Sequence, residues 1–157
     1  MKIATTTGDF GRYCKNDIER IRELHRAGFR YIDLDMYSFT PNCPYMQDDW
    51  QDGVLALKQE ADQLGMQFVQ AHSQGGNPLD DNQEHVDFLV AATIRSIEIC
   101  DMLGIKNTVA HPGFYKDISK EEWFERNRDF YKKSSKDGSI YVREECDVFA
   151  PSDNLTI

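Results

Sequence analysis

Apolar and polar positions follow two alternating periods along most of the chain. Within residues 18–24 the isoleucines and the leucine recur at helical spacing, and Gly28 follows where a left-handed helix end favours glycine. Residues 31–37 then alternate, with apolar side chains on one face and Asp33 and Asp35 on the other. The pattern predicts a helix, a glycine that ends it, and a short strand.

The same order of elements recurs along the chain. Gly28, Gly65 and Gly104 lie 37 and 39 residues apart, and each precedes a predicted strand. The residue seven positions after each glycine is, in order, Asp35, His72 and His111. A fourth glycine, Gly138, is followed at the same distance by Glu145. A period of this length indicates repeated supersecondary units.

These repeats predict the bounds of the elements. We expect strands at residues 2–6, 31–37, 68–72 and 108–111, and part of a fifth at 140–142. Helices are expected from an N-cap at Asn16 to Gly28, over 54–64, from a cap at Asp80 or Asp81 to Leu103, and from a capping box at 119–122 onward. Residues 36–53 read as a long loop, because they contain prolines and lack a helical period.

Strands that alternate with helices imply a parallel sheet with right-handed crossovers. A doubly wound sheet is one solution, but Gly8 and Gly11 match its glycine-rich phosphate loop poorly. Polar residues after successive strands favour the (β/α)₈ barrel, whose active site lies at the carboxyl ends of the strands. We therefore predict an α/β fold: a partial TIM barrel of four βα units plus part of a fifth. We expect residues 1–157 to form a single domain with an irregular tail from about residue 147.

Composition limits the classes of partner. The 157 residues carry a net charge of −9, which disfavours nucleic acid because its binders usually have a basic face. No apolar run is long enough for a signal peptide or a membrane span, so a cytoplasmic protein is expected. The four cysteines form no C-x-x-C pair and are expected to be reduced thiols, with Cys146 a candidate soft ligand.

The histidines that follow two strands are candidate ligands. Adjacent strands lie about 4.8 Å apart, so His72, His111 and a carboxylate from the fifth strand can converge on one ion. Two imidazoles and one carboxylate suit Zn²⁺, Mn²⁺ or Fe²⁺. The competing interpretation is that each histidine is only hydrogen-bonded at the rim. Asp33 and Asp35 are expected to orient neighbouring groups rather than to bind metal.

The chain resembles the xylose isomerase-like superfamily, the group of TIM barrels that contains sugar phosphate isomerases and epimerases and endonuclease IV. The resemblance is carried by the segments AGFRYIDL at 27–34, LGM at 64–66 leading to Ala71-His72, SIEICDMLG at 96–104, and AHPG at 110–113. It implies that His72 and His111 bind a divalent metal ion (Zn, Mn or Mg) or the sugar, and that Asp33 belongs to the substrate site. It also implies that Glu144 or Glu145 is a metal ligand and catalytic acid or base.

The resemblance covers only the first half of such a barrel, which needs about 250 residues. Ligands that the family places on strands six to eight have no counterpart here. We expect a sugar or sugar-phosphate isomerase or epimerase that uses metal-assisted proton transfer. The alternative is a truncated, non-catalytic half-barrel that acts by association, and an endonuclease IV-like phosphodiesterase is a distant third. The uncovered face of the sheet predicts a homodimer that buries Ala4, Thr6, Gln70 and Val109.

Overall fold

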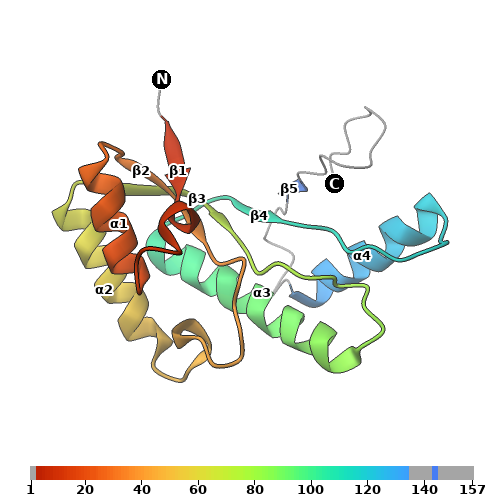
Figure 1. The fold of residues 1–157 in the computed structure, drawn as a ribbon. Coiled ribbons are helices and arrows are strands. Elements are labelled where there is room, and N and C mark those ends of the chain that lie inside the picture. The colour runs from red at the N-terminus through yellow and green to blue at the C-terminus, as the bar shows by residue number, and fades with distance from the viewer. Residues whose placement is uncertain (1–2, 135–142, 145–157) are drawn as a thin grey trace.

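The computed structural model describes residues 3–134 and 143–144, which form one parallel sheet and the helices that cover it (Figure 1). The strands are β1 (Ala4–Thr6), β2 (Tyr31–Asp35), β3 (Gln67–His72), β4 (Thr108–Ala110) and β5 (Arg143–Glu144). Every neighbouring pair is parallel, and the strand order is sequential, β1-β2-β3-β4-β5. This order confirms the partial TIM barrel and excludes the doubly wound sheet, in which the strand order reverses.

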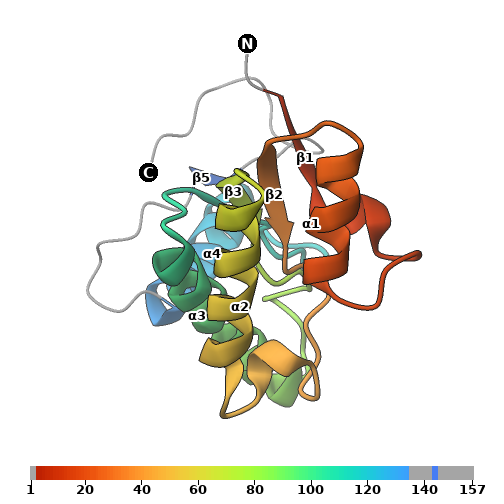
Figure 2. The same ribbon diagram turned by 90° about the vertical axis from the view of Figure 1, so that its left-hand side faces the viewer.

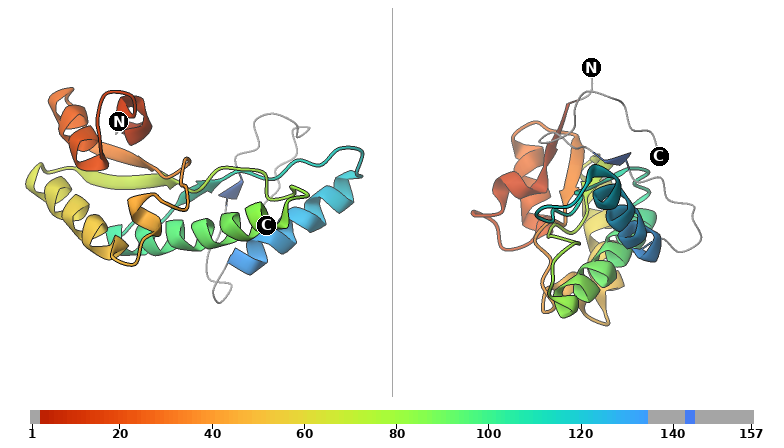
Figure 3. Two further views of the ribbon diagram at one scale, coloured as in Figure 1. Left: turned by 60° about the horizontal axis from the view of Figure 1, so that its bottom comes forward. Right: turned by 90° about the vertical axis from the view of Figure 1, so that its right-hand side faces the viewer.

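Four helices alternate with these strands. They are α1 (Asp17–Arg26), α2 (Trp50–Gln63), α3 (Gln83–Leu103) and α4 (Lys120–Ser134), with short 3₁₀ turns η1 (Thr7–Phe10) and η2 (Pro44–Met46). In Figure 2, α1, α2 and α3 follow one another across the outer side of the strands. Figure 3 shows α4 continuing this succession beyond α3. No helix among the described residues is long and apolar enough to cross a membrane.

Side-chain caps fix where the helices begin. Asn16 Oδ1 accepts a hydrogen bond from the Glu19 amide at 2.9 Å, and Ser119 Oγ accepts one from the Glu122 amide at 3.1 Å, so both predicted caps are confirmed. The predicted cap of the third helix was wrong. Asn82 caps α3 through the amide of His85, because Asp80 instead accepts the amide of Asn82 and forms the preceding turn.

The loop predicted for residues 36–53 is shorter than expected, since α2 begins at Trp50. The indole of Trp50 is 8% exposed, and the Arg95 guanidinium lies 4.3 Å from the ring centroid. A contact with α3 therefore contributes to the burial of the first residue of α2, although residues 50–53 lack a clear apolar period. The loop itself is held by the Tyr45 hydroxyl, which donates to Asp17 Oδ2 at 2.7 Å.

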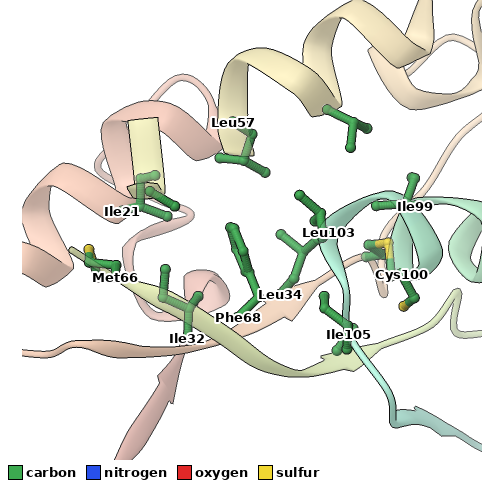
Figure 4. Packing of buried hydrophobic residues seen from close by; sticks show 14 of the residues in the cluster. Ile21, Ile32, Leu34, Leu57, Met66, Phe68, Ile99, Cys100, Leu103 and Ile105 are labelled. Atoms are coloured by element: carbon green, nitrogen blue, oxygen red, sulfur yellow. The ribbon is translucent and has the colours of Figure 1, made fainter. Parts of the chain in front are cut away.

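The apolar core lies between the sheet and the helices (Figure 4). Ile32 and Leu34 of β2 are fully buried there, and they belong to one cluster with Ile21 of α1, Leu57 of α2 and Ile99 of α3. Because strand residues alternate between faces, burying Ile32 and Leu34 under the helices turns Asp33 and Asp35 to the opposite face.

One irregularity interrupts this alternation in β3. Ile32 pairs with Phe68, but Asp33 pairs with Gln70, so Val69 is an extra residue in β3. This β-bulge lets Phe68 and Ala71 both lie buried although they are three positions apart. It places Gln70 beside Asp33, and His72 beside Asp35.

Two expectations concern parts of the chain that the structure does not describe: the strand at 140–142 and the tail from about 147 lie outside the described residues. A third was wrong in one detail. Val109 is only 6% exposed in the single chain, so it does not need a partner for burial. Ala4 is exposed, as the prediction of an uncovered face requires.

Candidate functional site

The inner face of the sheet carries a cleft of about 690 Å³. Its walls come from β1, β2, β3 and the loops that follow β1 and β2. The residues that line it are Ala4, Thr5, Thr6, Gly8, Asp33, Asp35, Tyr37, Ser38, Val69, Gln70 and His72. Two carboxylates, an amide and an imidazole thus meet in one open space, at the carboxyl ends of the strands where TIM-barrel sites lie.

Asp33 contacts two other polar side chains of the cleft, those of His72 and Gln70. Its carboxylate lies 3.0 Å (Oδ1) and 2.9 Å (Oδ2) from Nδ1 of His72. Gln70 Nε2 donates to Oδ2 at 2.9 Å. The Asp33 side chain is only 12% exposed, so it is held between its two partners rather than directed at solvent. Asp33 therefore holds the side chains of His72 and Gln70 in place, whereas its part in binding a substrate stays a prediction.

The contact with Asp33 decides which nitrogen of His72 can act on a ligand. A carboxylate accepts hydrogen bonds, so Nδ1 carries the proton that faces Asp33. Nε2 is then the nitrogen left for a metal ion or a substrate hydroxyl. The His72 side chain is 31% exposed, which keeps the ring accessible from the cleft.

His111 lies next to His72, as the repeat predicted. The two ring centroids are 6.1 Å apart with an interplanar angle of 22°. His111 follows the last residue of β4, and the Tyr131 hydroxyl of α4 donates to its backbone oxygen at 2.7 Å. The structure therefore brings together histidines that are 39 positions apart in the sequence.

Asp35 is the second carboxylate of the cleft. The Thr7 hydroxyl oxygen accepts from its backbone amide at 2.9 Å, and its own Oδ1 accepts from the amide of Tyr37 at 2.9 Å. A side chain at Gly8 would begin 2.6 Å from Asp35 Oδ2. Glycine at position 8 thus leaves that oxygen open toward the cleft.

The donor set fits part of a metal site. Imidazoles are common ligands of divalent metal ions. At many such centres a carboxylate accepts a hydrogen bond from the other ring nitrogen of the ligating histidine, as Asp33 does here with His72. Among the described residues, no group of three or more His, Cys, Asp or Glu side chains is placed to hold a metal ion. The third ligand was predicted at Glu144 or Glu145. The Glu144 backbone lies in β5 and pairs with Ala110, and Glu145 lies outside the described residues, so this choice stays a prediction.

Tyr37 is among the cleft residues that the sequence analysis did not single out. Tyr37 lines the cleft, and its ring meets the His111 ring edge-on, with centroids 5.6 Å apart at an interplanar angle of 78°. The alternation that placed Asp33 and Asp35 on one face continues to position 37, so the signal was present.

Comparisons with known proteins agree with this architecture. The family model described as xylose isomerase-like TIM barrel matches residues 21–136. No curated protein matches the chain.

Solved structures of similar fold include a D-tagatose 3-epimerase-like protein, with a TM-score of 0.64, 17% identity, and coverage of 92% of this chain and 52% of that one. Another is 3-keto-D-glucoside 4-epimerase from E. coli, with a TM-score of 0.60, 18% identity, and coverage of 84% and 49%. A third, an IOLI protein with a bound zinc atom, has a TM-score of 0.57, 12% identity, and coverage of 92% and 51%.

The chain spans about half the length of these structures. At such identities the structural likeness concerns the fold, whereas the family model covers most of the sequence. The chain belongs to the xylose isomerase-like TIM barrel family.

Proposed function

We propose that this chain is a sugar isomerase or epimerase-like protein whose inner cleft binds a sugar and supports proton transfer. The observation that carries the proposal is the pair formed by Asp33 and His72, beside the ring of His111. A carboxylate that binds one ring nitrogen of a histidine leaves the other ring nitrogen for a ligand. This arrangement recurs at metal and catalytic sites. The likeness in fold to several sugar epimerases supports the choice of substrate.

The proposal gives roles to polar residues of the cleft, to His111 beside it and to a glutamate near the end of the described chain. His72 and His111 hold a divalent ion or the sugar oxygens, and Asp33 keeps His72 in the required tautomer. A bound divalent ion would polarise the substrate carbonyl and so acidify the neighbouring carbon. Glu144 or Glu145 is the acid or base that moves the proton. Asp35 accepts hydrogen bonds from sugar hydroxyls.

Metal analysis and an activity screen test the proposal together. Purified protein is incubated with Zn²⁺, Mn²⁺ or Mg²⁺, and the amount of bound metal per chain is measured after desalting. Aldose and ketose panels, free and phosphorylated, are followed by chromatography. His72→Ala and His111→Ala should abolish both metal retention and turnover. His25→Ala is the matched control, because His25 lies in α1 on the outer layer. Wild-type protein without metal retention, sugar affinity or turnover would refute the proposal.

A non-catalytic half-barrel that acts by association is the second candidate. It is motivated by the length of the chain, which spans about half of the sugar epimerase structures of similar fold. In this form the chain is a homodimer that pairs sheet edges or inner faces, and Ile3, 59% exposed beside β1, is one apolar residue such a contact would cover. Light scattering at micromolar concentration decides between a dimer and an 18.2 kDa monomer. Binding without turnover across the sugar panel would favour this candidate.

Phosphodiesterase activity of the endonuclease IV type is the least supported function. The net charge of −9 opposes the DNA backbone, and the cleft is lined by two carboxylates. Nicking of DNA that contains an abasic site would revive it. The cytoplasmic location remains a prediction of the sequence.

A further inference from the structure

Tyr37 is an exposed aromatic side chain at the cleft. It is 47% exposed, so the ring is accessible to a ligand in the cleft. Within residues 3–134, the other large hydrophobic residues with high exposure are Ile3, Tyr13, Leu55 and Phe114, and none of them lines the cleft. Tyr37 therefore differs from them in where its ring lies.

The position of Tyr37 is fixed from three sides. Its amide donates to Asp35 Oδ1 at 2.9 Å, and its carbonyl accepts from the Gly75 amide at 3.0 Å. A side chain at the buried Gly75 would overlap the Tyr37 ring, so the ring lies directly against that backbone. His111 meets the ring edge-on. A ring held in this way is preorganised and loses little entropy when a ligand packs on it.

The chemistry around the ring fits a sugar. One face of a sugar ring presents C–H groups, which pack on an aromatic face, while its edge presents hydroxyl groups. Asp35 supplies hydroxyl acceptors two residues away from Tyr37, and the hydrogen bond between these two residues fixes their relative position. Asp33 and Gln70 add further polar groups in the same cleft.

The charge of the cleft further restricts the ligand. Its lining contains Asp33 and Asp35 but no lysine or arginine among the described residues. A phosphate group would meet two carboxylates without a compensating cation there, which is unfavourable in a partly desolvated site. The lining thus favours an uncharged sugar over a sugar phosphate.

We propose that Tyr37 is a specificity-determining residue on which the C–H face of an uncharged sugar ring stacks, with Asp35 accepting its hydroxyls. This inference rests on the proposed function, since it names the substrate class of the same cleft. It goes further by assigning the binding surface to the loop after β2, and by excluding a phosphorylated ligand from this part of the site.

Titrations with D-tagatose, D-fructose and D-fructose 6-phosphate, followed by NMR, test the inference on the full chain. Tyr37→Ala should weaken the binding of the free ketoses by about tenfold, whereas Tyr37→Phe keeps the ring and should change the Kd by less than about twofold. Tyr13→Ala is the control, because Tyr13 is 81% exposed and does not line the cleft. Saturation of the Tyr37 ring protons should transfer to the bound sugar in the wild-type protein, so one readout does not depend on a variant.

The possible results separate the two proposals. Wild-type protein that binds a free ketose, together with unchanged affinity in Tyr37→Ala and no transfer from the ring, overturns the Tyr37 assignment alone. Equal losses in Tyr37→Ala and Tyr37→Phe show that the hydroxyl rather than the ring face binds, and also overturn it. Tighter binding of the phosphorylated sugar overturns the preference for an uncharged ring. No binding of any sugar by the wild-type protein overturns the proposed function and the Tyr37 assignment with it.

Discussion

Replacing Asp33 with alanine should both destabilise the fold and release His72. The carboxylate accepts from Nδ1 of His72 and from Nε2 of Gln70, and its side chain is 12% exposed. Alanine removes the acceptor for both donors at once. The two donors line an open cleft, so water can replace part of what they lose.

The size of the effect follows from these contacts. A hydrogen bond to a charged group contributes about 1.5–3 kcal/mol, and partial replacement by water places the sum for both bonds at about 2–3 kcal/mol. For a chain of this length, each kcal/mol lowers Tm by about 2–4 °C. Asp33→Ala should therefore melt about 4–12 °C below the wild-type protein.

Asp33→Asn separates the hydrogen bonds from the charge. The asparagine oxygen can still accept from His72, and its amide can donate to Gln70 once the Gln70 amide turns over. We expect a loss of about 1 kcal/mol or less for this variant, because both contacts survive in neutral form. The difference between the two variants measures what the contacts themselves contribute.

Thermal melts and nitrogen NMR of the imidazoles provide the assay. The wild-type protein and Asp33→Asn should show His72 with its proton on Nδ1, whereas Asp33→Ala should lose that fixed tautomer. An Asp33→Ala variant that melts within about 1 °C of the wild-type protein and keeps the Nδ1 proton would contradict this prediction. Asp33 would then be a neighbour of His72 rather than its support.

Three further predictions concern stability and reactivity. Arg22 holds the pKa of Glu60 below its ordinary value of 4.5 through a side-chain hydrogen bond, so the pair stabilises the fold above pH 4.5 and this contribution is lost as pH falls through the lowered pKa. Glu60→Gln should accordingly lower Tm at pH 7, and melts at decreasing pH should show the difference shrinking. Burial raises the pKa of Cys100 to about 12, so native protein at pH 8 should alkylate Cys100 far more slowly than protein in urea, measured by mass spectrometry. Gly104 has φ 71°, and the space that a β-carbon would occupy there is open, so Gly104→Ala should cost only the backbone strain of about 1 kcal/mol in urea unfolding.

Local signals predicted most of the fold. Gly104 ends α3 in the left-handed region, as its place after an apolar helical stretch indicated. Asn16 and Ser119 were recognisable as caps because a suitable side chain preceded each helical pattern. The cap of α3 could not be chosen in the same way. Three successive residues, 80–82, have capping side chains, and the path of the preceding loop decides which one faces the helix.

The sequence predicted that the two histidines of the candidate site lie close together, but it did not predict their side-chain contacts. Spacing alone placed His72 and His111 at equivalent points of two repeats, and sequential strands then made them neighbours. The bond from His72 to Asp33 was not predictable, because the residue beside His72 in the register is Asp35. Asp35 already accepts the amide of Tyr37, whereas Asp33 lies one diagonal step back along β2. Side-chain contacts of this kind depend on which acceptors the backbone has used.

The bulge at Val69 shows how the core and the cleft are reconciled in one strand. Phe68 and Ala71 are both needed under the helices, yet strict alternation puts residues three apart on opposite faces. Without an extra residue, burying Phe68 would also turn Gln70 and His72 into the apolar layer, where an imidazole and an amide would lack partners. Inserting Val69 on the cleft side lets Phe68 pack outward while Gln70 and His72 reach Asp33. The polar network of the site therefore depends on the bulge at Val69. Strict alternation of side chains along β3 does not predict this bulge.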